Sequence, residues 1–246
     1  SIYGWRGANI RNILDFEKDF PNTTVIKLEQ NYRSTKKILD AANAVIQNNV
    51  TRKEKSLWTE NDSGSIIHIY KADNEYDEAR YVAEQIEQLQ KEGKVDRIGF
   101  SLYEPWELDQ ILKDGIPFSL IQVPYNIFDR QFEPYFKQLK EMGVEIHVRS
   151  TFLQGLFFKD RETLPEKLQP LKKYLIQLDE YAASKGISVG DLALNYNLYN
   201  PYIDGVLIGV DNKEQLLQNF ASVKDIEINL DIKVEELELL KPVNWQ

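Results

Sequence analysis

Short apolar runs alternate with helical patterns along most of the chain. Apolar residues recur with helical spacing in some segments, and compact runs rich in Val, Ile and Phe lie between them. This alternation predicts an α/β fold built on a parallel sheet or barrel. The expected strands are residues 24–28, 66–71, 95–100, 118–123, 144–148 and 205–208, and the expected helices include 9–20, 35–48, 74–91, 170–184 and 188–199.

Local residues mark several helix boundaries. Ser34 or Thr35 is suited to cap the helix that runs to about residue 48. Gly93 is expected to end the helix that precedes the third expected strand. No Pro-, Gly- or Ser-rich linker interrupts that helix, so the alternation continues in register through it.

Composition narrows the classes of protein that remain. The 246 residues are 42% hydrophobic and 28% charged, which is typical of a globular protein rather than a disordered one. A net charge of -9 argues against a generally basic surface for nucleic acid or anionic lipid. The absence of Cys excludes disulfides and thiol chemistry, and two distant His residues disfavour a His-rich metal site. We expect a cytoplasmic protein.

The beginning of the chain resembles neither a natural start nor a targeting segment. It lacks an initiator Met, and the run S-I-Y-G-W-R-G is not a signal peptide. The sequence also contains no apolar run long enough to span a bilayer, so no membrane partner is expected. We interpret the chain as a fragment.

Two clusters near the beginning combine aromatic rings with a cation. Tyr3, Trp5 and Arg6 lie in S-I-Y-G-W-R-G-A, a composition suited to stack on single-strand bases and to pair with phosphate. Tyr32 and Arg33 lie in L-E-Q-N-Y-R-S-T, just beyond an expected strand and at a helix start, where phosphates can bind. Either cluster alone is more often ordinary packing with a surface Arg.

Together, in this order and spacing, the clusters resemble the third and fourth motifs of superfamily-one DNA helicases of the UvrD/PcrA type. The resemblance continues through I-L-D-A-A-N-A-V-I and W-T-E-N and covers nearly all of the first 89 residues. It implies that Trp5 stacks on a DNA base while Tyr3 and Arg6 line the strand path. It also implies that Tyr32 stacks on adenine and that Arg33 reaches the γ-phosphate of ATP.

The groups that such a helicase needs for ATP hydrolysis are missing from the sequence. It contains no G-x-x-x-x-G-K-[ST] loop to hold phosphates, and the acidic Mg²⁺ motif that the family places before S-I-Y is also absent. We therefore expect a remnant ATP site without hydrolysis or unwinding.

Polar residues recur where three successive expected strands end in the second part of the chain. They occur in G-F-S-L-Y, L-I-Q-V and H-V-R-S, the last followed by L-Q-G. Each alone indicates a solvated strand end, but in a (β/α)8 barrel this end of the sheet forms the active site. Recurrence at three strands favours one shared site.

Residues 93–246 resemble the aldo-keto reductases, most clearly in N-Y-x-L-x-N-P-Y-I-D-G-V-L-I-G-V and the following E-Q-L-L-Q-N. The resemblance implies the C-terminal half of a TIM barrel, strands five to eight, joined in register to a helicase-derived α/β fragment. It implies that Ser101 and Gln122 bind the nicotinamide carboxamide and that Arg149 replaces a Tyr that stacks on the nicotinamide. The remaining cofactor positions that it implies are Ser150, Phe152, Gly209, Val210, Asp211, Gln215 and Asn219.

The chain departs from the reductase pattern in ways that change the expected chemistry. Gln215 replaces an Arg that pairs with the 2'-phosphate, Gly209 stands where many members have Lys, and Leu102 replaces an Asn. Loss of the cations weakens a preference for NADP, so NAD and NADP are equally plausible. The catalytic Tyr, Lys, Asp and His belong to the first four strands of the family's barrel, which are absent, so no catalytic residue is assigned.

Three interpretations follow for a chain whose expected domains are residues 1–92 and 93–246. We favour a fusion of two incomplete domains without complete catalytic activity. The second interpretation is a reductase-type oxidoreductase module completed by a partner chain or by the N-terminal strands. The third is weak binding of single-stranded DNA or ATP by the helicase-like part.

A half barrel would expose two sheet edges and its interior face, which proteins normally cover. Strands at residues 24–28 and 66–71 are candidates to cover one edge. Otherwise we expect self-association through the open half-barrel face.

Overall fold

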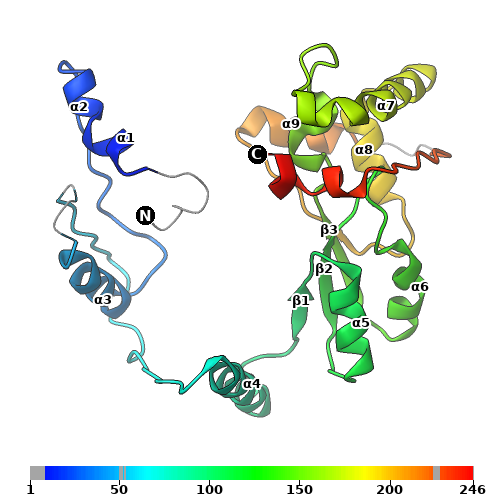
Figure 1. The fold of residues 1–246 in the computed structure, drawn as a ribbon. Helices are drawn as coiled ribbons and strands as arrows, with labels where there is room; N and C mark the ends of the chain where they lie inside the picture. The colour runs from blue at the N-terminus through cyan, green and yellow to red at the C-terminus, as the bar shows by residue number, and fades with distance from the viewer. Residues whose placement is uncertain (1–8, 50–51, 53, 224–227, 246) are drawn as a thin grey trace. The chain divides into compact units, whose positions relative to one another are not determined.

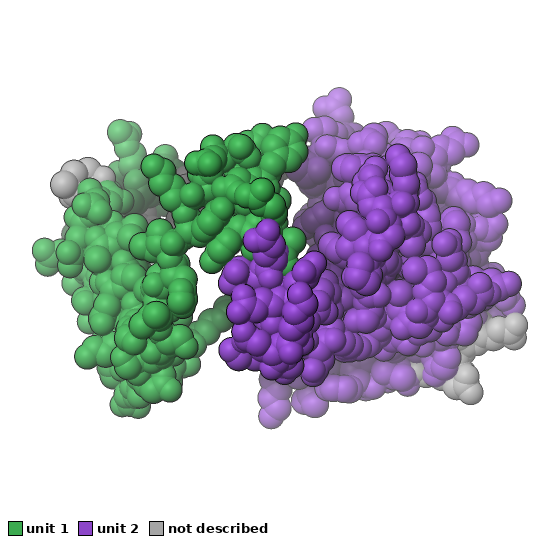
Figure 2. Space-filling model, turned by 90° about the horizontal axis from the view of Figure 1, so that it is seen from below, with its two compact units in different colours: residues 1–83 green, residues 84–246 purple. Residues whose placement is uncertain are grey.

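The computed structural model describes residues 9–49, 52, 54–223 and 228–245. The chain divides into two compact units, residues 1–83 and 84–246, coloured separately in Figure 2. The first contains the short helices α1 (Arg11–Leu14) and α2 (Phe16–Asp19), the longer helix α3 (Lys36–Gln47) and the start of α4 (Glu75–Lys91). The helix expected at residues 9–20 is therefore two single turns, which is consistent with the marginal stability of short helices.

The strands expected at residues 24–28 and 66–71 are wrong. The structure assigns no strand to either run, and the described part of the first unit contains only an isolated bridge between Gln30 and Trp58. Ile26 and Ile69 are 78% and 92% exposed. These runs have the composition of strands, but a strand also needs a neighbour for its backbone groups, and none lies beside them.

α3 is the longest helix that lies wholly within the first unit and makes its main described contacts. Leu39 is its buried residue, and the side-chain amide of Asn43 exchanges hydrogen bonds with the backbone of Leu57. At the start of the helix the N–H groups of Lys36 and Lys37 donate to the carbonyl oxygens of Asp62 and Ser63. The first free amides of α3 are thus satisfied by the chain itself.

The second unit is built on a parallel sheet of four strands in the order β1-β2-β3-β4 (Figure 1). Adjacent strands pair in register, so that Ser101 lies opposite Gln122 and Gln122 opposite His147. The α/β expectation is confirmed, with short edge strands and longer central ones. The strands are β1 (Gly99–Ser101), β2 (Leu120–Pro124), β3 (Glu145–Arg149) and β4 (Gly205–Val206).

One face of this sheet is buried beneath helices. In β2 and β3 buried and half-buried positions alternate, and the buried set packs with α5 (Pro105–Lys113) and α6 (Glu133–Glu141). The half-buried set, which includes Gln122, His147 and Arg149, lies on the opposite face. The core residues on the covered face are Leu108, Ile111, Ile121, Val123, Phe136, Leu139, Ile146 and Val148.

A second core lies beyond the carboxyl end of β3. It combines 3-10 turns, two helices and the C-terminal segment, whose residues Ile232, Val234 and Leu240 are buried. Arg161 binds both carboxylate oxygens of Asp179, at 2.8 and 2.7 Å, and so ties a loop to a helix. The elements are η2 (Leu153–Phe158), η3 (Glu166–Leu171), α7 (Lys172–Ser184), α8 (Val189–Leu198), η4 (Leu237–Leu240) and η5 (Pro242–Trp245).

The predicted end of α4 is confirmed, whereas Thr35 precedes α3 without the expected side-chain cap hydrogen bond. α4 ends at Lys91, where Gly93 has a φ of 68° and the N–H groups of Gly93 and Lys94 donate to Gln90 and Leu89. This Schellman arrangement explains why a glycine stands there. A last helix, α9 (Lys213–Ala221), follows β4. None of the helices in the described ranges has the length and apolar character needed to cross a membrane.

Candidate functional site

Polar side chains from three neighbouring strands lie near the carboxyl-terminal end of the sheet. Ser101 is the last residue of β1 and pairs in register with Gln122 of β2. Arg149 is the last residue of β3 and lies opposite Pro124, two positions beyond Gln122. Because the strands are parallel, their carboxyl ends meet at the same edge. The structure therefore brings together Ser101, Gln122 and Arg149.

Arg149 is fixed by contacts with all three strand ends. Its Nη1 donates to the carbonyl oxygen of Gln122 at 3.2 Å, and its Nη2 donates to that of Leu102 at 3.0 Å. The guanidinium carbon lies 4.4 Å from the ring centroid of Tyr103, within range of a cation–π contact. A positive charge is thus held in one place at this edge.

The backbone just after β3 adopts an uncommon conformation. Ser150, Leu153 and Gln154 have φ values of 65°, 45° and 49°, in the left-handed region that non-glycine residues rarely occupy. Such residues persist only where surrounding contacts hold them. Ser150 and Phe152, both expected to lie along a cofactor, belong to this turn, and the Phe152 ring packs 5.3 Å from that of Phe158.

Buried amides hold the loops after β2 and β3 together. Asn126 donates from Nδ2 to the carbonyl oxygen of Ser150 at 3.1 Å and accepts from the N–H groups of Phe128 and Asp129. Asn197 of α8 donates to the hydroxyl of Thr151 at 3.0 Å. These positioning residues did not emerge from the sequence. The available signal was a polar residue, Asn126, just beyond a strand and among apolar neighbours.

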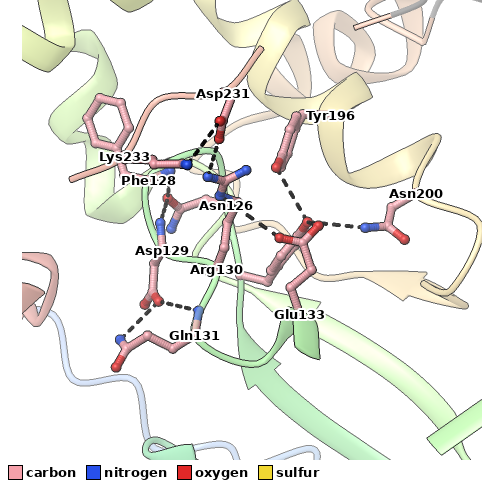
Figure 3. Close-up of polar contacts among 11 residues, drawn as sticks. Asn126, Phe128, Asp129, Arg130, Gln131, Glu133, Tyr196, Asn200, Asp231 and Lys233 are labelled. Carbon is pink, nitrogen blue, oxygen red and sulfur yellow. Dashed lines mark hydrogen bonds and ion pairs between the residues drawn. The ribbon is translucent and has the colours of Figure 1, made fainter. Parts of the chain in front are cut away.

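A second polar group lies beside the loop that follows β2 (Figure 3). The hydroxyl of Tyr125 donates to Glu133 at 3.2 Å, accepts from the amide of Asn200 at 3.1 Å, and lies 3.5 Å from the hydroxyl of Tyr196. Burial raises the pKa of Tyr125 well above its ordinary value. These four residues line part of a pocket of about 770 Å³ that also includes residues 228–231.

Ionic contacts join this loop to the C-terminal segment. Arg130 binds Asp231 at 2.6 Å and lies 3.9 Å from Glu133 (Figure 3). The hydrogen bond from Arg130 lowers the pKa of Asp231. Asp129 is buried, and loss of hydration raises its pKa even though Gln131 donates hydrogen bonds to it. The group therefore combines a fixed ion pair with a buried carboxyl whose pKa is raised.

The residues expected to bind the adenosine end of a cofactor lie on one continuous stretch after β4. The backbone N–H of Asp211 donates to the side-chain oxygen of Gln215 at 2.7 Å. The side-chain oxygen of Asn212 caps α9 by accepting from the Gln215 N–H at 2.8 Å. The Gln215 oxygen is thus already engaged within the turn. The stretch contains Gly209, Val210, Asp211, Gln215 and Asn219.

The helicase-like positions are only partly described. Tyr32 is exposed and its hydroxyl donates to Gln30 at 2.9 Å, while Arg33 is exposed in the same turn. Tyr3, Trp5 and Arg6 lie outside the described residues. Across the described positions, no group of three or more His, Cys, Asp or Glu residues is arranged to hold a metal ion.

Comparison with known proteins finds similarity both to a reductase family and to a helicase. The sequence model of the aldo/keto reductase family matches residues 34–234. ATP-dependent DNA helicase PcrA of Bacillus subtilis is 64% identical over 253 residues, covering 98% of this chain and 33% of the helicase. PcrA of Staphylococcus aureus (strain Mu50) is 46% identical over 142 residues, covering 58% of this chain and 19% of the helicase. The chain therefore spans a third or less of these curated relatives.

The fold agrees with the reductase match. The apo form of aldo-keto reductase AKR11C1 from Bacillus halodurans superposes with a TM-score of 0.51 and 25% sequence identity, covering 67% of this chain and 60% of that one. The reductase and helicase matches overlap along the sequence, so they do not by themselves fix a boundary. The chain combines helicase and reductase segments in one chimera, and it belongs to the aldo/keto reductase family.

Proposed function

We propose that the second unit binds a nicotinamide nucleotide, NAD or NADP, at the carboxyl ends of β1, β2 and β3. The observation that supports this most strongly is the juxtaposition of Ser101 and Gln122 in register, with Arg149 fixed beside them. In this proposal the four strands correspond to strands five to eight of a (β/α)8 barrel, and the polar ends of these strands form the binding edge.

The residues at this edge suit the chemistry of the cofactor. A nicotinamide carboxamide both donates and accepts hydrogen bonds, which the hydroxyl of Ser101 and the amide of Gln122 can answer. Ser150 and Phe152 would lie along the cofactor, and the stretch from Gly209 to Asn219 would hold its adenosine end. A bound nicotinamide supplies hydride chemistry, whereas the chain's own residues bind and orient it.

We further propose that neither half has a complete catalytic centre. In this view the junction lies within the helix between Asn74 and Lys91, just before the domain bound at residues 92–93, and no Tyr is assigned the role of proton donor to a carbonyl. In the helicase-like part, Tyr32 and Arg33 form a remnant nucleotide site. The N–H groups of Lys36 and Lys37 are already occupied by carbonyl oxygens, which disfavours phosphate binding at the start of α3.

Titration of the full chain with NADH and with NADPH, followed by nicotinamide fluorescence, tests the proposal. We expect saturable binding of both NADH and NADPH. No cation is assigned to the 2'-phosphate that distinguishes NADPH, so the chain has no stated preference between them. Gln122→Ala should weaken binding about tenfold, since it removes hydrogen bonds to the carboxamide. Gln138→Ala, at an exposed position on α6, serves as the matched control and should leave the affinity unchanged.

Three results would contradict the proposal or redirect it. Absence of saturable binding, or an affinity indifferent to Gln122→Ala, would overturn it. Reduction of a carbonyl substrate by the purified chain would favour the alternative of a reductase module completed by its own N-terminal part. ATP hydrolysis stimulated by single-stranded DNA, and lost in Arg33→Ala, would instead favour the helicase-like part as the functional one.

A further inference from the structure

α9 differs from α5, α6, α7 and α8 in what its apolar face contacts. α5, α6 and α9 each have nine residues, and α5 and α6 each bury two apolar side chains. α9 buries none, although Leu216, Leu217 and Phe220 lie on one face of it and Phe220 is 70% exposed. Within the described residues of the second unit, this face is uncovered.

The position of α9 in the sheet explains the difference. In a parallel sheet each helix crosses over in the right-handed sense and packs across its own strand and the next. α5 lies between β1 and β2 in the chain, and α6 lies between β2 and β3. α9 follows β4, which is the last strand of the sheet, so the next strand is missing. α9 therefore lacks the packing surface that another strand and its helix would provide.

The opposite edge of the sheet lacks a partner too. The Leu102 N–H donates to the Gln122 carbonyl and the Ile98 carbonyl accepts from the Ser119 N–H, so these residues, which flank β1, face β2. Because backbone groups alternate in direction along a strand, the N–H of Ser101 points away from β2. No described segment pairs with this outer edge of β1.

Both edges are bordered by exposed apolar side chains. Tyr103 and Trp106 follow β1, and Leu207 and Val210 follow β4. Exposed apolar surface next to an unpaired edge is typical of an interaction site.

We propose that two copies of this chain associate about a twofold axis, with β4 of each copy pairing in parallel with β1 of the other. Two sheets of four strands then form a closed sheet of eight, the number at which parallel α/β sheets close into barrels. α9 of each copy covers the junction and buries Leu216, Leu217 and Phe220. The same twofold axis thus pairs the free edges of β1 and β4 and covers the exposed face of α9 in each copy.

A second copy fits these observations better than the first unit of the same chain. The run that precedes α4 and β1, residues 66–71, belongs to no strand. Pairing of this run with β1 would satisfy one edge of the sheet, and it would not supply a partner for β4. A second copy supplies both missing surfaces at once. This inference does not depend on cofactor binding, so either proposal can fail alone.

Sedimentation velocity of the full chain over a range of concentrations tests the proposal. We expect a species of about 57 kDa, twice the chain mass of 28.7 kDa, that dissociates on dilution. The double variant Leu217→Lys/Phe220→Lys should sediment as a monomer. Lys is a good helix former and is favourable near a helix C-terminus, so α9 should still form, as measured by circular dichroism.

Two further variants make the result decisive. Met142→Lys places the same side chain at the exposed C-terminal end of α6, away from both edges, and should leave the dimer intact. Ser101→Pro removes the outward N–H of β1, together with the side-chain hydroxyl, and should also give a monomer. The proposal would be overturned by a wild-type chain that stays monomeric at every concentration or by an open-ended series of oligomers. It would also be overturned by a dimer that survives both Leu217→Lys/Phe220→Lys and Ser101→Pro.

Discussion

The guanidinium of Arg149 lies over the ring of Tyr103, 4.4 Å from its centroid, while it donates hydrogen bonds to two backbone carbonyls. The carbonyls belong to Gln122 in β2 and to Leu102 just after β1. One side chain therefore joins the ends of three strands, which positions this edge independently of any ligand.

Replacement of Arg149 by Lys should destabilise the second unit even though the charge is kept. An ammonium group has no planar fork with which to reach both carbonyl oxygens and stack on Tyr103. We expect a loss of about 2 kcal/mol in the free energy of unfolding, measured in urea by far-UV circular dichroism. Lys137→Ala, at an exposed position on α6, should change it by less than about 0.5 kcal/mol. Equal effects would show that Arg149 is not a structural tie.

Asn126→Ala should release the strained turn after β3. It removes the donor to Ser150 and leaves the buried N–H groups of Phe128 and Asp129 without their acceptor. Unsatisfied buried groups are costly, so we expect a loss of about 3 kcal/mol in urea unfolding. Hydrogen exchange at Leu153 should also accelerate, because its N–H donates to Ser150. Unchanged exchange at Leu153 would contradict the proposed tie between the loops.

The sequence alone predicted the elements whose signals are local. β2 and β3 were expected from apolar runs, the end of α4 from Gly93, and a helix was expected at residues 188–199. In the structure the Ser188 hydroxyl caps this helix by accepting from the Asp191 N–H. The runs at 24–28 and 66–71 have similar composition but form no strand. Strand pairing depends on a partner distant in sequence, and composition does not reveal whether one is present.

The same distinction applies to the candidate site. Placing polar residues at successive strand ends was enough to predict that Ser101, Gln122 and Arg149 lie near one another. The roles of Asn126 and Asn197 were not predictable, because their partners lie 24 residues away at Ser150 and 72 residues away at Tyr125. Such contacts are set by how loops meet in three dimensions.

Asp204→Asn should weaken the start of β4 in a pH-dependent way. Although burial alone would raise its pKa, the ion pair with Lys140 and the hydrogen bond from the Ile146 N–H hold the pKa of Asp204 below its ordinary value of 3.8. A lowered pKa contributes stability above that value, and the contribution disappears as pH falls through the folded-state pKa. We expect a loss of about 1 kcal/mol at pH 7 and a smaller loss at pH 3, because the contribution begins to shrink as pH falls below 3.8. The same loss at both pH values would exclude the ionic contribution.

Tyr125 should not ionise with the exposed tyrosines in alkaline titration. Burial raises its pKa, and its hydroxyl is held by Glu133 and Asn200. Tyr125→Phe should therefore leave the native absorbance change at 295 nm near pH 10 unaltered, whereas in urea the amplitude should fall by one tyrosine in 13. Because a raised tyrosine pKa favours the neutral folded form, native stability should fall as pH rises above about 10, and it should fall less in Tyr125→Phe. A native amplitude that drops in Tyr125→Phe would show that the hydroxyl is accessible and that the polar group of Figure 3 opens to solvent.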